Sequence, residues 1–345
     1  MDLSMSVLII QNCLEIIQIL PKSDKILMDS HSQKAWNWWK KFGEKPICLA
    51  PMAEISDLSW RILIRNHGVK VCWTGMLNAH QWSQGSGYQN KFFNTCPEDH
   101  PLIAQIAGSI EHQDLIIAAA KDLAKYADGV DVNLGCTQKI ASRSEYGYFM
   151  VDNCPKREKT LEMFRRLCKE VNCPICAKIR IFIDDSGEVS EKITIDFAKK
   201  LEEAGVSLIQ VHGRAEHRNK QADVYNDIIK HIVQAVNIPV VANGGINTVE
   251  EAHKFMEETG AAGVSVAQAL LKDPTAFDPT GKKPRKEYAL EYMNLSKEKG
   301  VRFFGPKKHI FIFYEKEIRE NKELAKQIEQ STTIEQLIEF INAHP

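Results

Sequence analysis

"PICAKIRIF", residues 174–182, is the stretch of sequence that decides the fold. It is apolar almost throughout and is not divided into an apolar and a polar face, which is typical of a strand buried on both sides of a parallel sheet. Seven further runs of this kind lie at residues 46–52, 71–76, 101–108, 129–135, 208–214, 239–245 and 263–268. We therefore expect eight buried strands.

Amphipathic stretches separate these runs, and two clear cases are "DLIIAAAKDLAKYA" at 114–127 and "ITIDFAKKLEEAG" at 193–205. Eight strands that each lead into a helical crossover predict an α/β protein built as a (β/α)8 TIM barrel. A doubly wound open sheet is the alternative fold. No G-x-G-x-x-G motif follows any of the runs, so the sequence gives no support to a Rossmann dinucleotide site.

The pattern changes near residue 284, after which helical periodicity continues without strand-like runs. The segment "DPTAFDPTGKKPRK" at 273–286 is rich in Pro, Gly and Lys, which is typical of a linker. We expect three parts along the chain: an N-terminal extension at 1–33, the TIM barrel at 34–281, and a small all-helical C-terminal domain at 282–345.

The composition is that of an ordinary globular protein, with 44% hydrophobic and 26% charged residues and a formal net charge of −1. So balanced a charge does not argue for a nucleic-acid partner. Nine scattered cysteines indicate reduced thiols in an intracellular compartment. Cys173 and Cys176 have zinc-like spacing, but no second pair follows, and we expect no metal. The segment "SVLIIQNCLEIIQIL" at 6–20 is too short and too polar to span a membrane.

Polar residues stand near the carboxyl ends of the predicted strands, where the catalytic groups of TIM barrels gather. The set comprises Glu54, Gln105, Asn133, Cys136, Lys178, Arg180, His212, Arg214, Asn243, Gly244, Gly245 and Gln268. Each alone has an ordinary structural explanation, since His212 could be a satisfied core histidine and Lys178 could extend its ammonium to solvent. Together they predict a ligand site at one mouth of the barrel.

Two features of this set point to the chemistry of the ligand. Backbone N–H groups at Gly244 and Gly245, with those after the eighth run, are placed as in the usual phosphate site of TIM barrels. A lysine in the mouth, here Lys178, can hold the negative charge of a reduced flavin. The residues therefore favour a phosphate-bearing cofactor, with FMN as the leading candidate.

Several of these segments also resemble one known family. "LAPM", "LIAQIAG", "VDVNLGC", "AKIRIF", "VHGR", "VVANGG" and the final helical region are similar to the tRNA dihydrouridine synthases in order and spacing, from about Lys34 onward. "DLSWRILIRNHG" at 57–68 and "NLGCTQKIASRSEYGYF" at 133–149 most resemble the eukaryotic branch that acts on the D-loop. The resemblance implies an oxidoreductase that uses NADPH and FMN to reduce uridine in tRNA to 5,6-dihydrouridine.

The resemblance implies a role for each residue of the site. The cofactor-binding residues would be Pro51, Met52, Gln105, Lys178, His212, Asn243, Gly244, Gly245, Ala267 and Gln268, and the substrate-binding residues of the barrel Asn133, Arg180 and Arg214. Cys136 would protonate C5 of the uracil as a general acid after hydride reaches C6. Tyr146 or Tyr148 could stack on a uridine that has left its helix.

The chain departs from the motifs of the family at several positions. The family's proline after the cysteine is Thr137, and further departures are Ser144, Tyr148, Ala215, Arg218, Ala267 and Gln268. Two alternatives therefore stay open: a non-catalytic barrel that serves as an RNA-binding or assembly subunit, and a flavin enzyme that reduces a small molecule.

Residues 282–308 carry nine lysines and arginines against three glutamates. This basic stretch predicts phosphate contacts with tRNA, and we expect Lys307 and Lys308 to make them. The expected partners are thus tRNA and NADPH, without a membrane. We expect a monomer in the cytoplasm, with the oligomeric state and a nuclear or mitochondrial location left open. The identity of the modified uridine cannot be read from the sequence.

Overall fold

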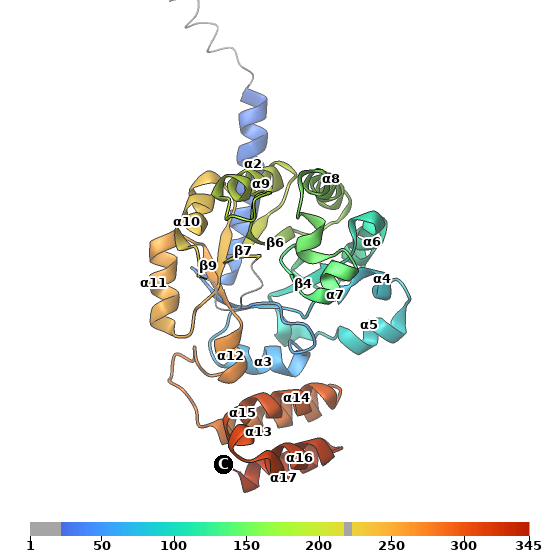
Figure 1. Ribbon diagram of the computed structural model, residues 1–345, viewed down its shortest axis with the longest axis vertical. Coiled ribbons are helices and arrows are strands. Elements are labelled where there is room, and N and C mark those ends of the chain that lie inside the picture. The colour runs from blue at the N-terminus through green and yellow to red at the C-terminus, as the bar shows by residue number, and fades with distance from the viewer. Residues whose placement is uncertain (1–21, 217–222, 345) are drawn as a thin grey trace, which may run out of the picture.

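The computed structural model describes residues 22–216 and 223–344. Its central feature is a parallel sheet in the order β2-β1-β9-β8-β7-β6-β5-β4, which closes into a barrel where β2 pairs with β4 (Figure 1). The strands are β1 Ile47–Leu49, β2 Val71–Trp73, β4 Leu102–Ala107, β5 Gly129–Asn133, β6 Ile175–Ile181, β7 Leu208–Ala215, β8 Val240–Asn243 and β9 Gly263–Val266. A short extra strand, β3 (Leu77–Asn78), pairs with β4. The predicted TIM barrel is confirmed.

Helices follow the barrel strands and pack against the outside of the barrel. The longer ones are α3 Leu58–Asn66, α6 Gln113–Leu123, α8 Cys154–Glu170, α9 Glu191–Glu203, α10 Asn226–Ala235 and α11 Val249–Thr259, and the short ones are α4 Ala79–Trp82, α5 Ser86–Phe92, α7 Lys139–Arg143 and α12 Gln268–Lys272. Polar N-caps start several of them: Asp57 begins α3, Ser190 begins α9 and Thr248 begins α11, each accepting a bond from a backbone N–H of the first turn.

Alternate residues of each strand face the helices and the barrel interior. On β6, for example, Ala177 packs in the large outer core, whereas Cys176 belongs to a separate inner cluster. This inner cluster is apolar and comprises Trp39, Cys48, Val71, Trp73, Ile103, Cys176, Leu208, Val241 and Ala262. It fills the half of the barrel nearest the amino ends of the strands.

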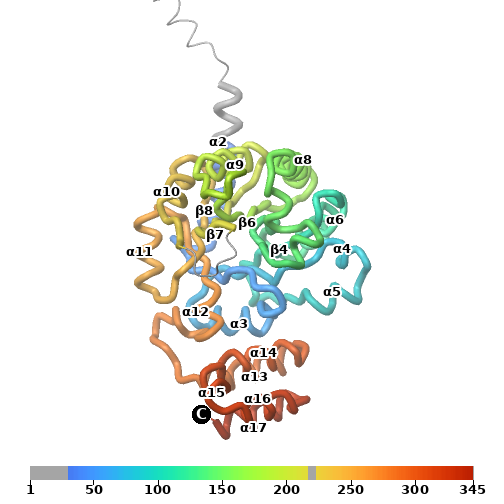
Figure 2. Tube along the Cα trace, viewed as in Figure 1, coloured from blue at the N-terminus to red at the C-terminus, as the bar shows by residue number. Residues whose placement is uncertain are grey.

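The last turns of helix α2 (Lys22–Trp39) close this apolar end (Figure 2). Its last turn carries three tryptophans whose indole N–H groups donate to backbone carbonyls at the amino ends of three strands. Trp36 bonds to Asn237 at 2.9 Å, Trp38 to Asp128 at 3.0 Å, and Trp39 to Ala262 at 3.0 Å. The segment 22–33, predicted as part of an extension, is thus continuous with the helix that plugs the barrel. Residues 1–21 lie outside the described residues.

Five further helices form the C-terminal region, drawn in red in Figure 1. They are α13 Arg285–Glu298, α14 Phe304–Phe313, α15 Glu315–Glu320, α16 Lys322–Gln330 and α17 Ile334–Ala343, and they follow a non-helical segment at 273–284. Within the described part of the chain, no helix is both long and apolar enough to cross a membrane.

Helix α3 connects the barrel to the C-terminal helices, and we call this helix, together with the residues that contact it on either side, the joint. The indole of Trp60 stacks on the ring of His309 with centroids 4.1 Å apart, and the Tyr292 hydroxyl donates to the Asp57 carboxylate at 2.6 Å. The imidazole Nε2 of His309 donates to the carbonyl of Ile55 at 3.0 Å. These contacts fix the C-terminal helices beside the loop that follows β1.

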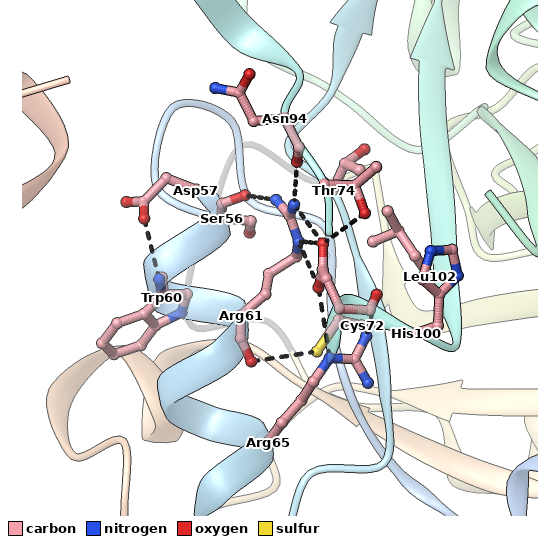
Figure 3. A network of polar contacts seen from close by, with 12 residues as sticks. Ser56, Asp57, Trp60, Arg61, Arg65, Cys72, Thr74, Asn94, His100 and Leu102 are labelled. Carbon is pink, nitrogen blue, oxygen red and sulfur yellow. Dashed lines mark hydrogen bonds and ion pairs between the residues drawn. The ribbon is translucent and has the colours of Figure 1, made fainter. Parts of the chain in front are cut away.

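The buried face of α3 carries an ion-pair network (Figure 3). The guanidinium of Arg61 binds the Asp99 carboxylate through Nε and Nη2, the latter at 2.6 Å, and also donates to the carbonyls of Ser56 and Asn94. Arg65 adds an ion pair to Asp99 at 3.4 Å. Burial opposes the charge of Arg61, but the Asp99 carboxylate outweighs it and raises the pKa of the guanidinium.

Candidate active site

The half of the barrel interior nearest the carboxyl ends of the strands is polar. The ammonium of Lys178 on β6 reaches Asn243 Oδ1 on β8 at 3.5 Å, and the indole N–H of Trp73 on β2 donates to Asp131 Oδ2 on β5 at 3.2 Å. Each pair skips the strand between its partners, so these side chains point into the barrel. We call this end of the barrel, with its loops, the mouth.

Asn133, the last residue of β5, joins two of the predicted site residues. Its Nδ2 donates to Gln105 Oε1 at 2.8 Å, and its Oδ1 accepts from the backbone N–H groups of Gly135 at 3.1 Å and Cys136 at 3.0 Å. The side chain therefore turns the backbone at the end of the strand and sets the position of Cys136. This is a role in addition to the substrate contact that the sequence suggested.

The loop after Cys136 folds back on this residue. The backbone N–H of Tyr148 donates to the Cys136 carbonyl at 3.1 Å. Gly147 has φ +66°, and a Cβ atom there would lie 2.7 Å from the same carbonyl oxygen. A side chain at position 147 would thus displace the loop. The half-buried Cys136 side chain packs with Tyr146 and Ala107, and burial raises the pKa of the Tyr146 hydroxyl to about 12.

Three cationic side chains surround His212 at the mouth. The Arg180 Nε donates to the carbonyl of Gly135 at 2.6 Å, and Arg214 Nη1 lies 3.2 Å from His212 Nε2. Burial, with the charges of Lys178, Arg180 and Arg214, lowers the pKa of His212 to about 2. The imidazole is therefore neutral at physiological pH, and its Nε2 accepts the bond from Arg214. The mouth can accommodate an anionic group.

The loops after β8 and β1 complete the mouth. Gly244 and Gly245 have φ of +127° and +73°, and a Cβ atom on Gly244 would lie 3.2 Å from the His212 ring. Asn243 is held by its Nδ2, which donates to the Ser265 carbonyl at 2.7 Å. Met52, which follows Pro51, lies beside the loop after β2. A Cβ atom on Gly75 of that loop would lie 3.1 Å from the carbonyl oxygen of Met52. Ala267 caps α12 and Gln268 begins it.

The sequence interpretation missed three polar residues of the barrel interior: Asp131, Gln210 and Ser265, all fully buried. Gln105 Nε2 donates to Asp131 Oδ2 at 2.7 Å, so Asp131 belongs to the same network as Gln105 and Asn133. The signal was present in "GVDVN", where a carboxylate stands between two valines of a strand with no polar face. An acid at such a position is rare without a partner.

The structure bears on two further suggestions from the sequence. Tyr148 packs in the core against Phe182 and is only 3% exposed, so it is not an accessible surface for stacking on a base. The ammonium of Lys307 donates to the carbonyls of Glu329 and Ser331 at the end of α16, which commits it to a contact within the C-terminal helices. An RNA contact through Lys307 would have to compete with these bonds, and it stays a prediction.

Acids outside the basic stretch at 282–308 pair with five of its nine cations. Ion pairs join Lys282 to Asp273, Arg285 to Glu317, Lys297 to Glu335, Lys299 to Glu98 and Lys308 to Glu54. The stretch is thus less of a positive surface than its sequence indicates. Of the positions that depart from the family motifs, Thr137 and Ser144 lie in the Cys136 loop and Ala215 ends β7, while Arg218 lies outside the described residues.

Three known relatives share much of the chain. The tRNA-dihydrouridine(16/17) synthase-like protein of Rattus norvegicus is 31% identical over 86% of this chain and 66% of its own length. The tRNA-dihydrouridine(16/17) synthase of Schizosaccharomyces pombe is 34% identical over 76% of this chain and 66% of its own length. The human tRNA-dihydrouridine(20a/20b) synthase-like protein is 31% identical over 86% of this chain and 89% of its own length. The chain thus spans slightly under two thirds of the 16/17-type relatives.

A solved structure agrees with the fold. The old yellow enzyme homologue of Zymomonas mobilis superposes with a TM-score of 0.50 at 12% identity, over 66% of this chain and 86% of its own. The family model of dihydrouridine synthases (Dus) matches residues 48–344, which include the barrel strands, the Cys136 loop and the C-terminal helices. With the identities above, this match shows that the chain belongs to the dihydrouridine synthase family.

Proposed function

We propose that this chain is an FMN-dependent tRNA-dihydrouridine synthase that reduces uridine to 5,6-dihydrouridine with NADPH. One observation carries the proposal: Cys136 and the cationic group around His212 meet at the same mouth. Arg180 joins them, because it bonds to the carbonyl before Cys136 and pairs in register with His212. The names of the relatives, which specify dihydrouridine synthesis in tRNA, support the same reaction.

The residues at the mouth fit a flavin mononucleotide. Lys178 would face the pyrimidine end of its ring, and Gln105 and Met52 would border the ring. The loop at Asn243, Gly244 and Gly245 would seat the phosphate, with Ala267 and Gln268 beside it. A neutral His212 next to Arg214 offers hydrogen bonds to an anionic group without a further charge of its own.

Bound flavin supplies the hydride that C6 of the uracil accepts. Cys136 holds the proton for C5: its S–H bond breaks, a C–H bond forms at C5, and a thiolate remains. Arg180 bonds to the carbonyl of Gly135, the residue before Cys136, so the thiolate would form in a loop that holds a cation. Asn133 and Arg180 would orient the base, which has to leave its helix at a cost of a few kcal/mol to reach the mouth.

The three-part organisation remains part of the proposal: an N-terminal extension at 1–33, the FMN-binding barrel at 34–281 and a tRNA-binding helical domain at 282–345. Lys308 beside the exposed ring of Phe304 is our candidate RNA contact in the helical domain. A monomeric state and a cytoplasmic location stay predictions.

The test is mass spectrometry of tRNA after incubation with protein, FMN and NADPH, together with the flavin absorbance of the protein near ~450 nm. We expect dihydrouridine in the tRNA and a yellow protein. Cys136→Ala should keep the flavin and reduce product formation by about 10²–10⁴-fold, the usual contribution of a general acid. Cys154→Ala, which removes an exposed thiol from α8, is the matched control and should be fully active.

A second function has one specific observation in its favour. The Cys136 loop differs from the family motifs at Thr137, Ser144 and Tyr148, and Tyr148 is packed into the core. A barrel that binds RNA without catalysis would have such a closed loop. A colourless protein that binds tRNA but neither takes up FMN nor forms dihydrouridine would support this second function, and a small-molecule reductase would be yellow but inactive on tRNA.

A further inference from the structure

We propose that Asp131 is a positioning residue of the mouth, which acts through Gln105 and Asn133 to hold the backbone of Cys136. This inference rests on the proposed function for its importance to catalysis, but the contacts that carry it do not depend on that function. Asp131 is fully buried, and among the described residues it is the only acid within the eight barrel strands.

The chain of contacts has a fixed direction, because an ionised carboxylate can only accept hydrogen bonds. Asp131 Oδ2 accepts from Gln105 Nε2 at 2.7 Å, which forces the Gln105 Oε1 to the opposite side of the carboxamide. That oxygen accepts from Asn133 Nδ2 at 2.8 Å. Reversal of the Gln105 carboxamide would place an oxygen against the carboxylate and an NH₂ group against another NH₂ group.

Asn133 passes this orientation on to the backbone of the catalytic loop. Because the Asn133 Nδ2 is directed at Gln105, the Asn133 Oδ1 is directed at the backbone of the loop. It accepts hydrogen bonds from the N–H groups of Gly135 and Cys136 at 3.1 and 3.0 Å. A wrong orientation of Asn133 would leave both N–H groups of this buried turn without an acceptor. The position of the Cys136 backbone therefore depends on a carboxylate that does not touch it.

Asp131 also faces the charge of Lys178. Burial raises the pKa of Asp131, while the Gln105 bond, the Lys178 charge and the Trp73 bond act in the opposite direction. The bonds from Gln105 and Trp73 both come from N–H donors, which favours the carboxylate over the acid. The Asp131 charge in turn raises the pKa of Lys178, which burial and Arg180 lower. Asp131 thus supports a protonated lysine at the mouth.

A role in packing alone does not account for the buried polar residues in this part of the barrel interior. Among the described residues, Asp131 Oδ1, both polar atoms of Gln210 and the Ser265 hydroxyl are buried without a hydrogen-bond partner. Unsatisfied buried groups cost stability, and apolar residues of similar volume are often more stabilising than buried charges. The polar groups are retained at a cost, which is typical of a functional site.

The test reverses the donor and acceptor between positions 105 and 131. Gln105→Glu sets a carboxylate against Asp131 and should break the chain of contacts. Adding Asp131→Asn should restore it, because the new amide at position 131 can donate to the new carboxylate at position 105, which still accepts from Asn133. The amide then faces the Trp73 N–H, so the Trp73 bond is lost, but this bond is not part of the chain of contacts to Cys136. Asp131→Asn alone should preserve the chain of contacts, because its oxygen can accept the bond from Gln105.

The readout is alkylation of Cys136 by iodoacetamide in the native, purified protein at pH 8, mapped by peptide mass spectrometry. We expect Gln105→Glu to raise the Cys136 rate about tenfold, and the double variant and Asp131→Asn to lie within about twofold of wild type. The buried thiols of Cys48, Cys72 and Cys176 should stay protected in all variants. A merely structural role would instead expose these thiols together with Cys136.

Gln105→Met removes the hydrogen bonds without adding a charge, and it serves if Gln105→Glu does not fold. It should raise Cys136 alkylation to a similar extent, and Asp131→Asn should not rescue it. Ser265→Ala, a change in the same buried layer, is the matched control and should leave the rate unchanged. A wild-type rate in Gln105→Met, or no rescue of Gln105→Glu, would overturn the proposal. Neither result depends on dihydrouridine formation, so failure of the proposed function is detected separately.

Discussion

The mouth and the joint both bury charged and histidine side chains, but they pair them differently. At the joint, cations contact carboxylates directly, as Arg61 does with Asp99 at 2.6 Å. At the mouth, Lys178 contacts the carboxamide of Asn243, Arg180 contacts the carbonyl of Gly135, and Arg214 contacts a neutral imidazole. The joint neutralises its charges through direct ion pairs, whereas the mouth holds three cations around His212.

This difference separates structural from functional burial of charge. A buried ion pair is costly to break, because the remaining partner is left uncompensated. At the mouth, the direct contacts of Lys178 and Arg180 are to neutral groups, so these cations gain less structural stability from their partners and favour an anionic ligand. The predictions below test whether changes at the joint affect stability and changes at the mouth affect binding.

The largest effect on stability is expected at the joint. Asp99→Ala removes the carboxylate that binds both Arg61 and Arg65, and it leaves the Arg61 charge buried. We expect the free energy of unfolding in urea to fall by about 3–5 kcal/mol. Glu98→Ala, which removes an exposed neighbouring carboxylate, is the control and should leave it nearly unchanged. Equal effects of the two variants would contradict the assignment of Asp99 to the stability of the joint.

The next effect concerns binding at the mouth. Lys178→Met removes an ammonium whose hydrogen bond to Asn243 is a long one, at 3.5 Å. We expect FMN to bind about 10–100-fold more weakly, the contribution of a hydrogen bond from a charged group. The free energy of unfolding without ligand should change by less than ~1.5 kcal/mol, since Asp131 can take up a proton when the lysine is absent. FMN titration followed by flavin fluorescence measures the affinity.

Lys200→Met is the control for this substitution, because it removes an exposed lysine of α9 that pairs with Glu158. It should leave the affinity for FMN unchanged. Unaltered affinity in Lys178→Met would place the cofactor elsewhere and would weaken the distinction between the mouth and the joint.

The sequence was sufficient for the barrel and for most residues of the mouth. Runs such as 174–182 and 208–214 have no polar face, so their burial on both sides follows from local pattern alone. The order of the strands then brings their carboxyl ends together, which is enough to predict Lys178 and His212 at one end of the barrel.

Contacts between distant segments could not be predicted in this way. The pairing of Lys308 with Glu54 depends on how the C-terminal helices dock, and no local pattern encodes it. The role of Asp131 in the site was not predicted for a different reason, since a single acid in an apolar run does not change the assignment of a strand. The same holds for Tyr148, whose burial follows from the path of the loop back to Cys136.

The pH dependence of stability, measured with and without FMN, should distinguish the histidine of the joint from that of the mouth. Burial lowers the pKa of His309, and the charge of Lys308 acts in the same direction, while Asp57 and the Ile55 carbonyl oppose it. The unfolded chain then binds a proton below about pH 6.5 that the native protein does not, so stability falls as the pH decreases through this range. From pH 7.5 to 5.5, His309 should account for a loss of at most about 1.4 kcal/mol, the limit for a histidine that stays neutral in the native protein.

His309→Gln should remove this part of the loss, because glutamine does not titrate, and urea unfolding at the two pH values measures it. His212→Asn should also reduce the loss, since the pKa of His212 is lowered to about 2. Bound FMN should change only the part of this pH-dependent loss of stability that comes from His212 at the mouth. If FMN altered the contribution of His309 as well, the two regions would not be independent.

The smallest effect is expected for two adjacent lysines of α14, Lys307 and Lys308. We expect one to affect RNA binding and the other to affect stability. Lys308→Gln removes a half-exposed ammonium that pairs with Glu54 at 3.3 Å, so it should change stability by less than ~1 kcal/mol. If Lys308 contacts a phosphate, the substitution should lower tRNA affinity and reduce the slope of log K against log salt by about 1.

Lys307→Met should instead lower stability by about 0.5–1.5 kcal/mol, through its lost bonds to α16, and leave the slope unchanged. Fluorescence anisotropy of labelled tRNA between about 50 and 200 mM salt measures the slope. A reduced slope in Lys307→Met alone would assign the RNA contact to the lysine that the structure places inside the helical region.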